Sequence, residues 1–557
     1  MKPLTIIPIL LAAATVGHAG SKLAKDLEGV DPKKEIDVIV QFKDAPTTER
    51  HQEIASIGGQ LRAQLDAVRA GLYRIPAVAL PRLANNPNVT YVTPDRRVLR
   101  TLDYAAQTVG ALAAHDFHWR GSGVGIAIID SGVINSLDFD DPASRKTRIV
   151  YRESFDPGAS GYDDYGHGSH VAGIAAGNGG SSTGVGFLRT FKGIAPEANI
   201  LDLRVLDKDG IGTDSRVIAA IQKATSLKKR YNVRVINLSL GRPVYESYKL
   251  DPLCQAVEAA WKAGIVVVVA AGNSGRDNSF GTEGHGTINS PGNDPYVITV
   301  GALRGKENLT YVDDEIASYS SKGPTLIDHV VKPDLAAPGN RIVSLDAGRF
   351  FHNNYPGNIM GYCAIHTCSG AEGYSLYYKM SGTSMATPMV SGAAALLLQK
   401  EPALTPDQVK ARLMKHANKN IPVSSFSTDP VTGVTYVNQH NIFAVGAGYL
   451  NAYAALNYSD VASGTALSPT AAFDASTNTV SLVFADGVTW GTGVTWGTGV
   501  VWGTGVIQGS GVVWGTGVVW GTGGNPAGTG IVWGTGVVWG TGNPQGESSL
   551  IAVNGEN

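Results

Sequence analysis

Four polar residues with side chains suited to catalysis border apolar runs of the sequence, either at the end of a run or at the start of one. Asp130 ends VGIAIID, His167 opens HGSHVAGIAAG, Asn273 follows IVVVVAAG, and Ser384 lies at the start of TSMATPMVSGAAALLLQK. Taken singly, an Asp, Asn or Ser at such a place is more often a turn or capping residue. The chain order Asp, His, Ser, with an amide donor between the last two, instead predicts a serine nucleophile served by a histidine base.

A metal site is the competing interpretation of the histidines. His167 and His170 are three residues apart before an apolar, helix-like run. Zinc needs a third protein ligand, usually a carboxylate placed by a spacing such as HExxH, and this motif offers none. A second GHGT, at residues 284–287, precedes a loop rich in turn residues. We therefore expect His285 not to be the base, and His170 to pack within its helix.

The elements that must position these residues alternate along residues 103–458. We expect apolar strands at residues 124–130, 199–206, 233–240, 265–271 and 296–303, with helical patterns such as SRVIAAIQKATSLKKR between them. Near-continuous Val and Ile strands separated by helices indicate an α/β fold, a parallel doubly wound sheet with helices on both faces. Ligands bind such sheets beyond the carboxyl ends of the strands, which is where Asp130 and Asn273 stand.

This region resembles the subtilisin-like serine proteases, the subtilases of peptidase family S8. The motifs that carry the resemblance span the whole middle region: AIIDSG around Asp130, GHGSHVAG around His167, VINLSLG at 235–241, AAGN ending at Asn273, KPDLAAPG at 332–339 and SGTSMATPMVSG around Ser384. They are highly specific. Ser169, where Thr is usual in the family, is a chemically mild departure.

The resemblance implies a role for each of the four residues. Ser384 attacks the scissile carbonyl, His167 takes its proton, and Asp130 fixes the imidazole tautomer. Asn273 and the Ser384 backbone N–H hold the oxyanion. Catalysis of this kind requires no cofactor. Structural calcium is common in the family, but its ligands cannot be mapped here, and DFDDPAS at residues 138–144 is too generic to assign.

The resemblance also implies where a protein or peptide substrate binds. The loop DGIGT would pair with substrate backbone as an added strand, which reads little sequence. Two further segments would line the pocket for the residue before the cut, and neither contains an acidic residue, which favours an uncharged side chain. The implied substrate-binding residues are Gly210, Ile211, Gly212, Ser239, Leu240, Gly241, Ala270, Ala271 and Gly272.

The residues before 103 divide into two segments. Residues 1–19 have the Lys, apolar run and small residues of a secretory signal peptide, so we expect an exported protein. Residues 20–102 contain, at about 35–100, an α+β module with a helix expected from residue 47 to about 70. By the resemblance this module is an inhibitor I9-like propeptide, which blocks the protease's own cleft and is cut near residues 97–103.

Charge and cysteine content exclude several classes of protein. The formal net charge is −2, so no basic surplus favours a nucleic-acid partner. After the signal peptide, no stretch is apolar for the roughly 20 residues that a membrane helix needs. The chain has three cysteines. Cys363 and Cys368 are expected to form a local disulfide in an oxidising compartment, and Cys254 to be a buried apolar residue.

Residues 459–557 form a C-terminal region whose repeats, at residues 487–546, have VVWGTG as their unit. Seven of the nine tryptophans fall here, mostly six residues apart. An even period would put every Trp on one face of an extended chain. The repeat is a flexible Gly-rich linker, a repetitive β segment with no partner, or a surface that contacts a cell surface or polysaccharide. The alternative function is accordingly a surface-binding or adhesive repeat protein whose protease domain serves mainly for processing.

Overall fold

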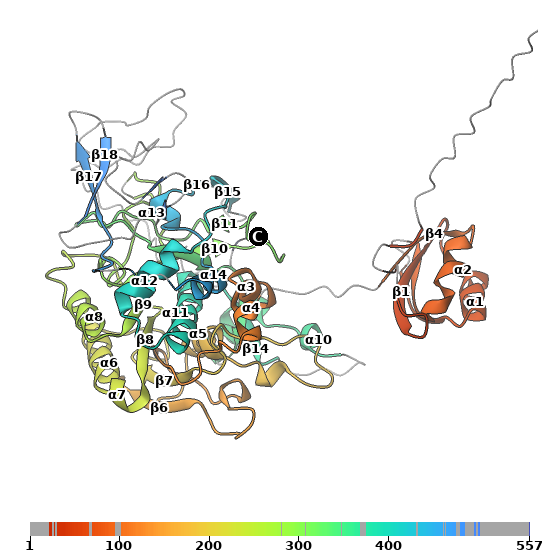
Figure 1. Cartoon of the computed structure of the whole chain (residues 1–557), viewed down its shortest axis with the longest axis horizontal. Coiled ribbons are helices and arrows are strands. Elements are labelled where there is room, and N and C mark those ends of the chain that lie inside the picture. Colours follow the sequence, from red (N-terminus) through yellow and green to blue (C-terminus); the bar gives the residue numbers. More distant parts are fainter. Residues whose placement is uncertain are drawn as a thin grey trace, which may run out of the picture. The chain divides into compact units, whose positions relative to one another are not determined.

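The computed structural model describes residues 22–24, 27, 30–65, 69–94, 102–279, 281–306, 308–346, 348–367, 375–429, 433–459, 462, 464–474, 479–484, 495–496, 500–501 and 556. The chain forms two compact units, Met1–Val98 and Leu99–Asn557 (Figure 1). The expected signal peptide and nearly all of the tryptophan repeat lie outside the described residues. The division into four segments therefore stays a prediction.

The N-terminal unit is a four-stranded antiparallel sheet with two helices. Its strands follow the order β2-β3-β1-β4 and enclose a core of alternating apolar residues such as Val38, Val40, Tyr73 and Ile75. The elements are β1 (Glu35–Phe42), α1 (Thr48–Ser56), β2 (Gln60–Leu65), β3 (Ala70–Pro76), α2 (Leu80–Asn85) and β4 (Val89–Pro94).

The helix expected from residue 47 to about 70 is wrong beyond Ser56. Gly58 has a φ of 92°, a left-handed conformation that favours glycine and stops the helix. The chain then turns back as β2, which pairs with β3 at the edge of the sheet. The polar sequence QLRAQL reads equally well as an exposed helix or as an exposed edge strand, so pairing with β3 decides between them.

The second unit is built on an eight-stranded sheet that confirms the expected α/β fold. The strand order is β11-β10-β9-β8-β5-β7-β6, with β12 also paired to β10, and every pairing is parallel except β10 with β11. Short strands β6, β11 and β12 were not expected. The strands are β5 (Gly125–Asp130), β6 (Ile149–Ser154), β7 (Asn199–Arg204), β8 (Val233–Leu238), β9 (Val266–Ala270), β10 (Ile298–Arg304), β11 (Glu315–Ile316) and β12 (Leu335–Pro338).

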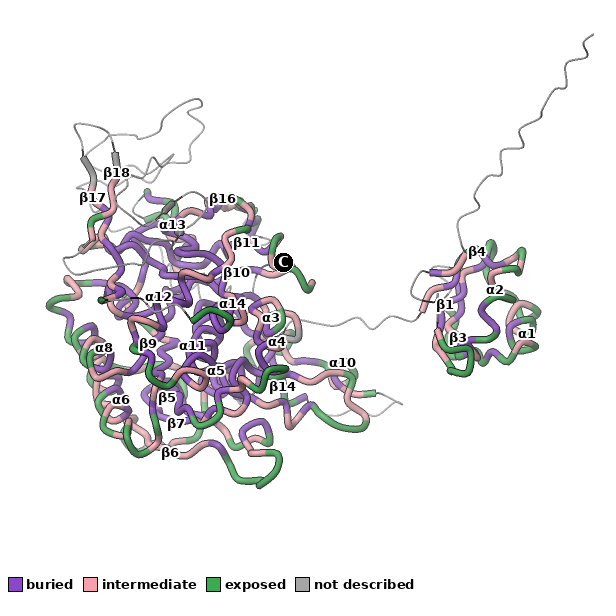
Figure 2. The backbone as a smooth tube through the Cα atoms, viewed as in Figure 1, coloured by how far each residue is buried: buried purple, intermediate pink, exposed green. Residues whose placement is uncertain are grey.

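Helices cover both faces of this sheet. α6 (Asp214–Ser226) packs against α8 (Pro252–Lys262), and α5 (His167–Ala176) packs against α11 (Thr383–Lys400). In Figure 1, β8 and β9 lie between these two pairs. α8 begins at Pro252 with Asp251 as its cap, because the Asp251 carboxylate accepts from Leu253 N. Figure 2 shows the central strands β5, β8 and β9 and most of α11 as buried.

The remaining elements surround this core. Among the described residues no helix is long and apolar enough to span a membrane. The elements are α3 (Leu102–Thr108), α4 (Ala111–Asp116), α7 (Lys228–Tyr231), β13 (Ile342–Leu345), α9 (Arg349–Asn354), α10 (Tyr362–Ile365), β14 (Tyr377–Met380), α12 (Pro406–Lys415), β15 (Ser424–Thr428), β16 (Thr435–Gln439), α13 (Ile442–Val445), α14 (Ala452–Asn457), β17 (Thr470–Asp474), β18 (Thr479–Val483), β19 (Thr495–Trp496) and β20 (Val500–Val501).

Candidate active site

Asp130 and His167 meet at the carboxyl edge of the sheet. Asp130 ends β5 and is fully buried, and His167 is the first residue of α5. His167 Nδ1 lies 2.7 Å from Asp130 Oδ1. Burial lowers the pKa of His167, but the charge and hydrogen bond of Asp130 outweigh burial and raise the pKa above its ordinary value of 6.5. Gly168 permits this approach, since a Cβ there would lie 2.2 Å from Gly132 O.

The loop before His167 is held by a residue that the sequence analysis missed. Asp163 Oδ1 accepts from Ser131 Oγ at 2.8 Å and from Gly166 N at 2.7 Å, while its Oδ2 accepts from Ser169 N at 2.8 Å and Ser169 Oγ at 2.7 Å. Burial raises the pKa of the Asp163 carboxyl. The only sequence signal is the acidic pair in DDYGHG, which a turn would equally explain.

Ser384 is the second residue of α11, and its backbone carbonyl has an unusual partner. Pro388 lies inside the helix and has no N–H, so the carbonyl four residues earlier, that of Ser384, has no helical donor. Ser239 Oγ, just beyond β8, donates to this carbonyl at 2.8 Å. The proline thus leaves a carbonyl that connects the first turn of α11 to the end of the neighbouring strand β8.

The Ser384 hydroxyl donates to the backbone carbonyl of Ser239 at 3.0 Å. The contacts of the described residues include no hydrogen bond between Ser384 and His167. Their helices, α11 and α5, pack side by side, with both residues in the first turns. Catalytic hydrogen bonds often form only once substrate is bound, and rotation about χ1 is the motion that redirects the hydroxyl.

Asn273 is oriented by the same helix start. Its Oδ1 accepts from Thr383 N at 2.9 Å and from Thr383 Oγ1 at 3.0 Å. Because Thr383 occupies the amide oxygen, the amide nitrogen Nδ2 of Asn273 remains available to donate a hydrogen bond to a substrate. A Cβ on Gly382 would lie 3.2 Å from Nδ2, and Gly382 has a φ of 144°, so glycine leaves room for this amide beside Ser384.

The predicted pocket segments lie side by side because they follow the neighbouring parallel strands β8 and β9. Asn289, which the sequence analysis missed, lies between them. Its N–H donates to Ala271 O at 2.9 Å. A Cβ on Gly241 would meet Asn289 Cβ at 3.1 Å, and one on Gly272 would meet Asn289 Cγ at 2.9 Å. The other predicted residues of these segments are Ser239, Leu240 and Ala270, of which Leu240 is half-buried and the other two are buried.

Residues 210–212 form an exposed loop, and the Ile211 side chain is 65% exposed. Tyr165 lies beneath it, since a Cβ on Gly210 would fall 2.6 Å from Tyr165 Cζ. The same ring packs against Phe350 and Phe351, at 4.9 Å between centroids in each case. Helix α9, which contains Phe350 and Phe351, therefore contacts the loop that leads to His167.

Comparison with known proteins decides the family. The profile of the subtilase family (peptidase S8) matches residues 121–448. The chain is 34% identical to serine protease AprX of Bacillus subtilis over 405 residues, covering 70% of this chain and 84% of AprX. It is 32% identical to subtilisin E of the same organism over 427 residues, covering 75% and 89%.

The chain belongs to the subtilase family. It is a subtilisin-like serine endopeptidase. It is also 33% identical over 365 residues to an extracellular serine proteinase of a Thermus strain, covering 64% of this chain and 72% of that one. Among solved structures, sphericase aligns with a TM-score of 0.41 and 27% identity, covering 59% of this chain and 92% of that chain.

Two other histidines of this subtilase, His170 and His285, are buried and lie against backbone carbonyls. His285 Nδ1 is 2.7 Å from Gly323 O, and burial lowers the pKa of His285 to about 3. His170 Nε2 lies 3.2 Å from Ile342 O, and burial likewise lowers its pKa to about 3. Both imidazoles are therefore neutral over the ordinary pH range.

The cysteines of this subtilase fall into two kinds. Cys254 is free and buried, and burial raises the pKa of its thiol. Cys363 is disulfide-bonded. Its predicted partner, Cys368, lies outside the described residues.

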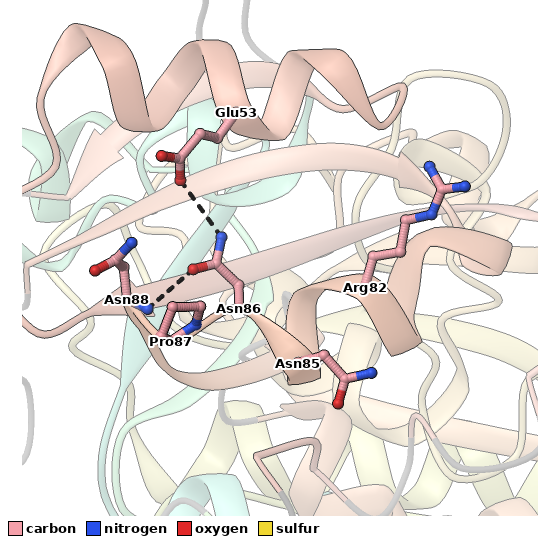
Figure 3. Close-up of a pocket in the computed structure, with 6 residues that line it drawn as sticks. All are labelled: Glu53, Arg82, Asn85, Asn86, Pro87 and Asn88. Carbon is pink, nitrogen blue, oxygen red and sulfur yellow. Dashed lines mark hydrogen bonds between the residues drawn. The ribbon is translucent and has the colours of Figure 1, made fainter.

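A hollow of about 530 Å³ on the N-terminal unit offers no competing site (Figure 3). Within it, Asn86 Nδ2 donates to Glu53 Oε2 at 3.4 Å, and Asn86 Oδ1 accepts from Asn88 N at 2.9 Å. No nucleophile stands beside a base there. The lining residues are Glu53, Arg82, Asn85, Asn86, Pro87 and Asn88.

Proposed function

We propose that this subtilase is a secreted endopeptidase that cleaves peptide bonds through Asp130, His167 and Ser384 and an acyl-enzyme intermediate. The observation that carries the proposal is the 2.7 Å contact between His167 Nδ1 and the buried Asp130 carboxylate, with Ser384 in the first turn of the adjoining helix. A buried carboxylate on Nδ1 fixes the tautomer in which Nε2 is free to accept a proton.

In the acylation step, the Ser384 hydroxyl rotates away from Ser239 O, transfers its proton to His167 Nε2, and its oxygen bonds to the scissile carbonyl carbon. The carbonyl oxygen becomes an oxyanion, which Asn273 Nδ2 and the Ser384 N–H stabilise. His167 then gives its proton to the amine, which leaves as the C–N bond breaks. Water repeats the sequence on the ester and returns Ser384 to its free form. None of these steps uses a cofactor.

The substrate is an extended protein or peptide segment paired with residues 210–212. Exposure of Ile211 leaves the loop open to such pairing. The pocket between residues 239–241 and 270–272 is lined with small residues and with the neutral amide of Asn289. An uncharged side chain before the cut suits this lining, because a charged one would lose its hydration without gaining an opposite charge.

Synthesis as a zymogen accounts for the N-terminal unit. The expected signal peptide and the named extracellular relative support export. The N-terminal unit, with its own core, is a separate compact body, which suits an inhibitor that is cut away and released.

We assign no ligands to calcium. Among the described residues, no group of three or more His, Cys, Asp or Glu side chains could hold a metal ion.

Hydrolysis of casein by the native chain and by Ser384→Ala tests the proposal, together with the mass of each N-terminus. We expect casein cleavage and a new N-terminus near residue 100 in the native chain only. If both chains were folded, unprocessed and inactive at neutral and alkaline pH with calcium present, the proposal would fail.

We also propose, from the spacing of the seven tryptophans, that the repeat contacts a cell surface or polysaccharide. Aromatic side chains at an even period suit stacking on sugars. A chain lacking residues 487–546 should keep full activity on soluble casein and lose retention on cell walls. Unchanged retention would refute the adhesive role.

A further inference from the structure

The penultimate residue of the chain, Glu556, is buried in the catalytic unit. It lies far beyond the last described strand in sequence, yet its side chain is only 3% exposed. Burial of a carboxylate is costly unless charged or hydrogen-bonding partners replace the water it loses. Glu556 has such partners for both its backbone and its side chain.

Asn340, between β12 and β13, binds the backbone of Glu556. Asn340 Nδ2 donates to the Glu556 carbonyl at 2.9 Å, and Glu556 N–H donates to Asn340 Oδ1 at 2.9 Å. One side-chain amide therefore satisfies both main-chain groups of a single residue. This pairing fixes the position of the main chain at Glu556 independently of its side-chain contacts.

The Glu556 carboxylate sits between two arginines. Its Oε1 accepts from Arg276 Nη2 at 2.9 Å, from Ser318 N at 3.0 Å and from Ser318 Oγ. Its Oε2 lies 3.7 Å from Arg304 Nη1. Charge-assisted bonds of this kind are stronger than those between neutral groups. The site therefore recognises the charge and length of a glutamate.

The Glu556 carboxylate joins a set of direct ion pairs in this cluster. Arg276 also pairs with Asp429 at 2.7 Å, and Glu315 pairs with both Arg304 and Lys306. The cluster thus has three cations, in Arg276, Arg304 and Lys306. Asp429 and Glu315 supply two anions, and Glu556 supplies the third.

We propose that this cluster is an intramolecular receptor for the C-terminal segment of the chain, with Glu556 as the recognised residue. β17 and β18, which precede the tryptophan repeat in the chain, also pack on this unit. The receptor adjoins the active site: Arg276 is three residues beyond Asn273, and Gly339, next to Asn340, accepts from Gly382 N at 2.8 Å.

Carboxypeptidase trimming of the full chain tests this receptor, in a Ser384→Ala background that prevents self-cleavage. Intact mass after timed digestion reports how fast residues leave the C-terminus. We expect Asn557 to be released and trimming at Glu556 to be slowed about tenfold or more relative to a free peptide of the last ten residues, because a buried, paired end is cut only when it opens.

Glu556→Gln should lose this protection. Its trimming rate is compared with that of a free peptide that carries the same substitution, so that the preference of the carboxypeptidase for Gln over Glu cancels. Glu547→Gln, which removes the same charge from the same tail, is the matched control and should keep it. Asn340→Ala should lose protection from the receptor side. Equal protection in Glu556→Gln and the parent, or trimming of the parent as fast as the free peptide, would overturn the proposal.

Discussion

With His167 as the proposed base, we expect its protonation to set the pH dependence of this protease, because an imidazole accepts a proton only when it is neutral. Asp130 raises the pKa of His167 above 6.5. We therefore expect kcat/KM to fall as the pH drops, with the midpoint above pH 6.5. Asp130→Asn should lower kcat by about 10⁴, a magnitude taken from another serine protease, and move the midpoint to lower pH. The pH profile of peptide hydrolysis checks both, and a midpoint well below 6.5 in the native chain would contradict the assignment.

The same ion pair affects stability in the opposite direction. Because the folded chain holds the His167 proton more tightly than the unfolded chain, the pair stabilises the fold fully below the unfolded pKa of 6.5. This contribution is lost as the pH rises through the raised pKa of the folded state. The free energy of unfolding, measured against pH for the native chain and for Asp130→Asn, should therefore differ most at acidic pH.

As the proposed oxyanion donor, Asn273 would act in the transition state, so its removal should affect rate more than binding. Asn273→Ala is expected to lower kcat by about 10² to 10³, a range that comes from a subtilisin. KM should change little, and steady-state kinetics separates the two. Thr383→Ser, which keeps the hydroxyl that orients the amide, is the control and should stay near the native rate. A loss confined to KM would argue against the oxyanion role.

Asn289 should help to set the preference for the residue before the cut. Asn289→Asp adds a carboxylate of nearly the same shape between the pocket segments, and we expect it to raise kcat/KM for Lys or Arg relative to Leu or Phe, by about tenfold for one buried charge pair. A set of peptides that differ at this position measures the change. Asn289→Ser serves as the neutral control, and an unchanged order of preference would place Asn289 outside the pocket.

At the scale of elements, α11 is joined to the end of β8 by the hydrogen bond from Ser239 Oγ to the Ser384 carbonyl. This carbonyl has no helical donor because Pro388 lacks an N–H. Ser239→Ala leaves the Ser384 carbonyl without its donor, which should cost about 1–3 kcal/mol of unfolding free energy. In a Pro388→Ala background the restored helical N–H can bond the same carbonyl. The loss from Ser239→Ala should then shrink, and denaturant unfolding of the double-mutant cycle measures the difference. Equal losses in both backgrounds would rule out this link.

The long strands were predictable because their physics is local and repetitive. The apolar runs at β5, β8 and β9 predict strands, and the structure has strands there. Asp130 and Asn273 could be singled out because they lie at or just after the carboxyl ends of β5 and β9. β2 was missed because its exposed sequence suits either helix or strand. Asp163 and Asn289 were missed for a different reason, since their roles exist only after distant segments pack.

At the scale of the whole molecule, a second buried ionic cluster joins the central sheet to Ser468, which lies just before β17. Asp334 lies 2.7 Å from Lys332 Nζ and 3.2 Å from Lys410 Nζ, both fully buried, and it accepts from Ser468 Oγ at 2.5 Å. Asp334→Asn would remove the carboxylate that both buried lysines contact directly. We expect a loss of about 3–5 kcal/mol in denaturant unfolding.

The matched control for this cluster is the exposed pair of Arg120 and Glu197, whose side chains are 39% and 41% exposed. Glu197→Gln should cost less than about 1 kcal/mol, because water already screens that pair. Similar losses in the two variants would show that burial does not decide the effect. Nothing in the sequence marks Ser468 or Glu556 as a residue that joins distant segments, since their partners lie tens to hundreds of residues away.

The most direct test of the account is covalent labelling of the folded protein by an organophosphorus fluoride, followed by peptide mass mapping. The account predicts one label per chain, on Ser384, with labelling abolished in Ser384→Ala and slowed by orders of magnitude in His167→Ala. A label on another residue, or equally fast labelling without His167, would contradict the claim that Asp130, His167 and Ser384 act as one catalytic unit.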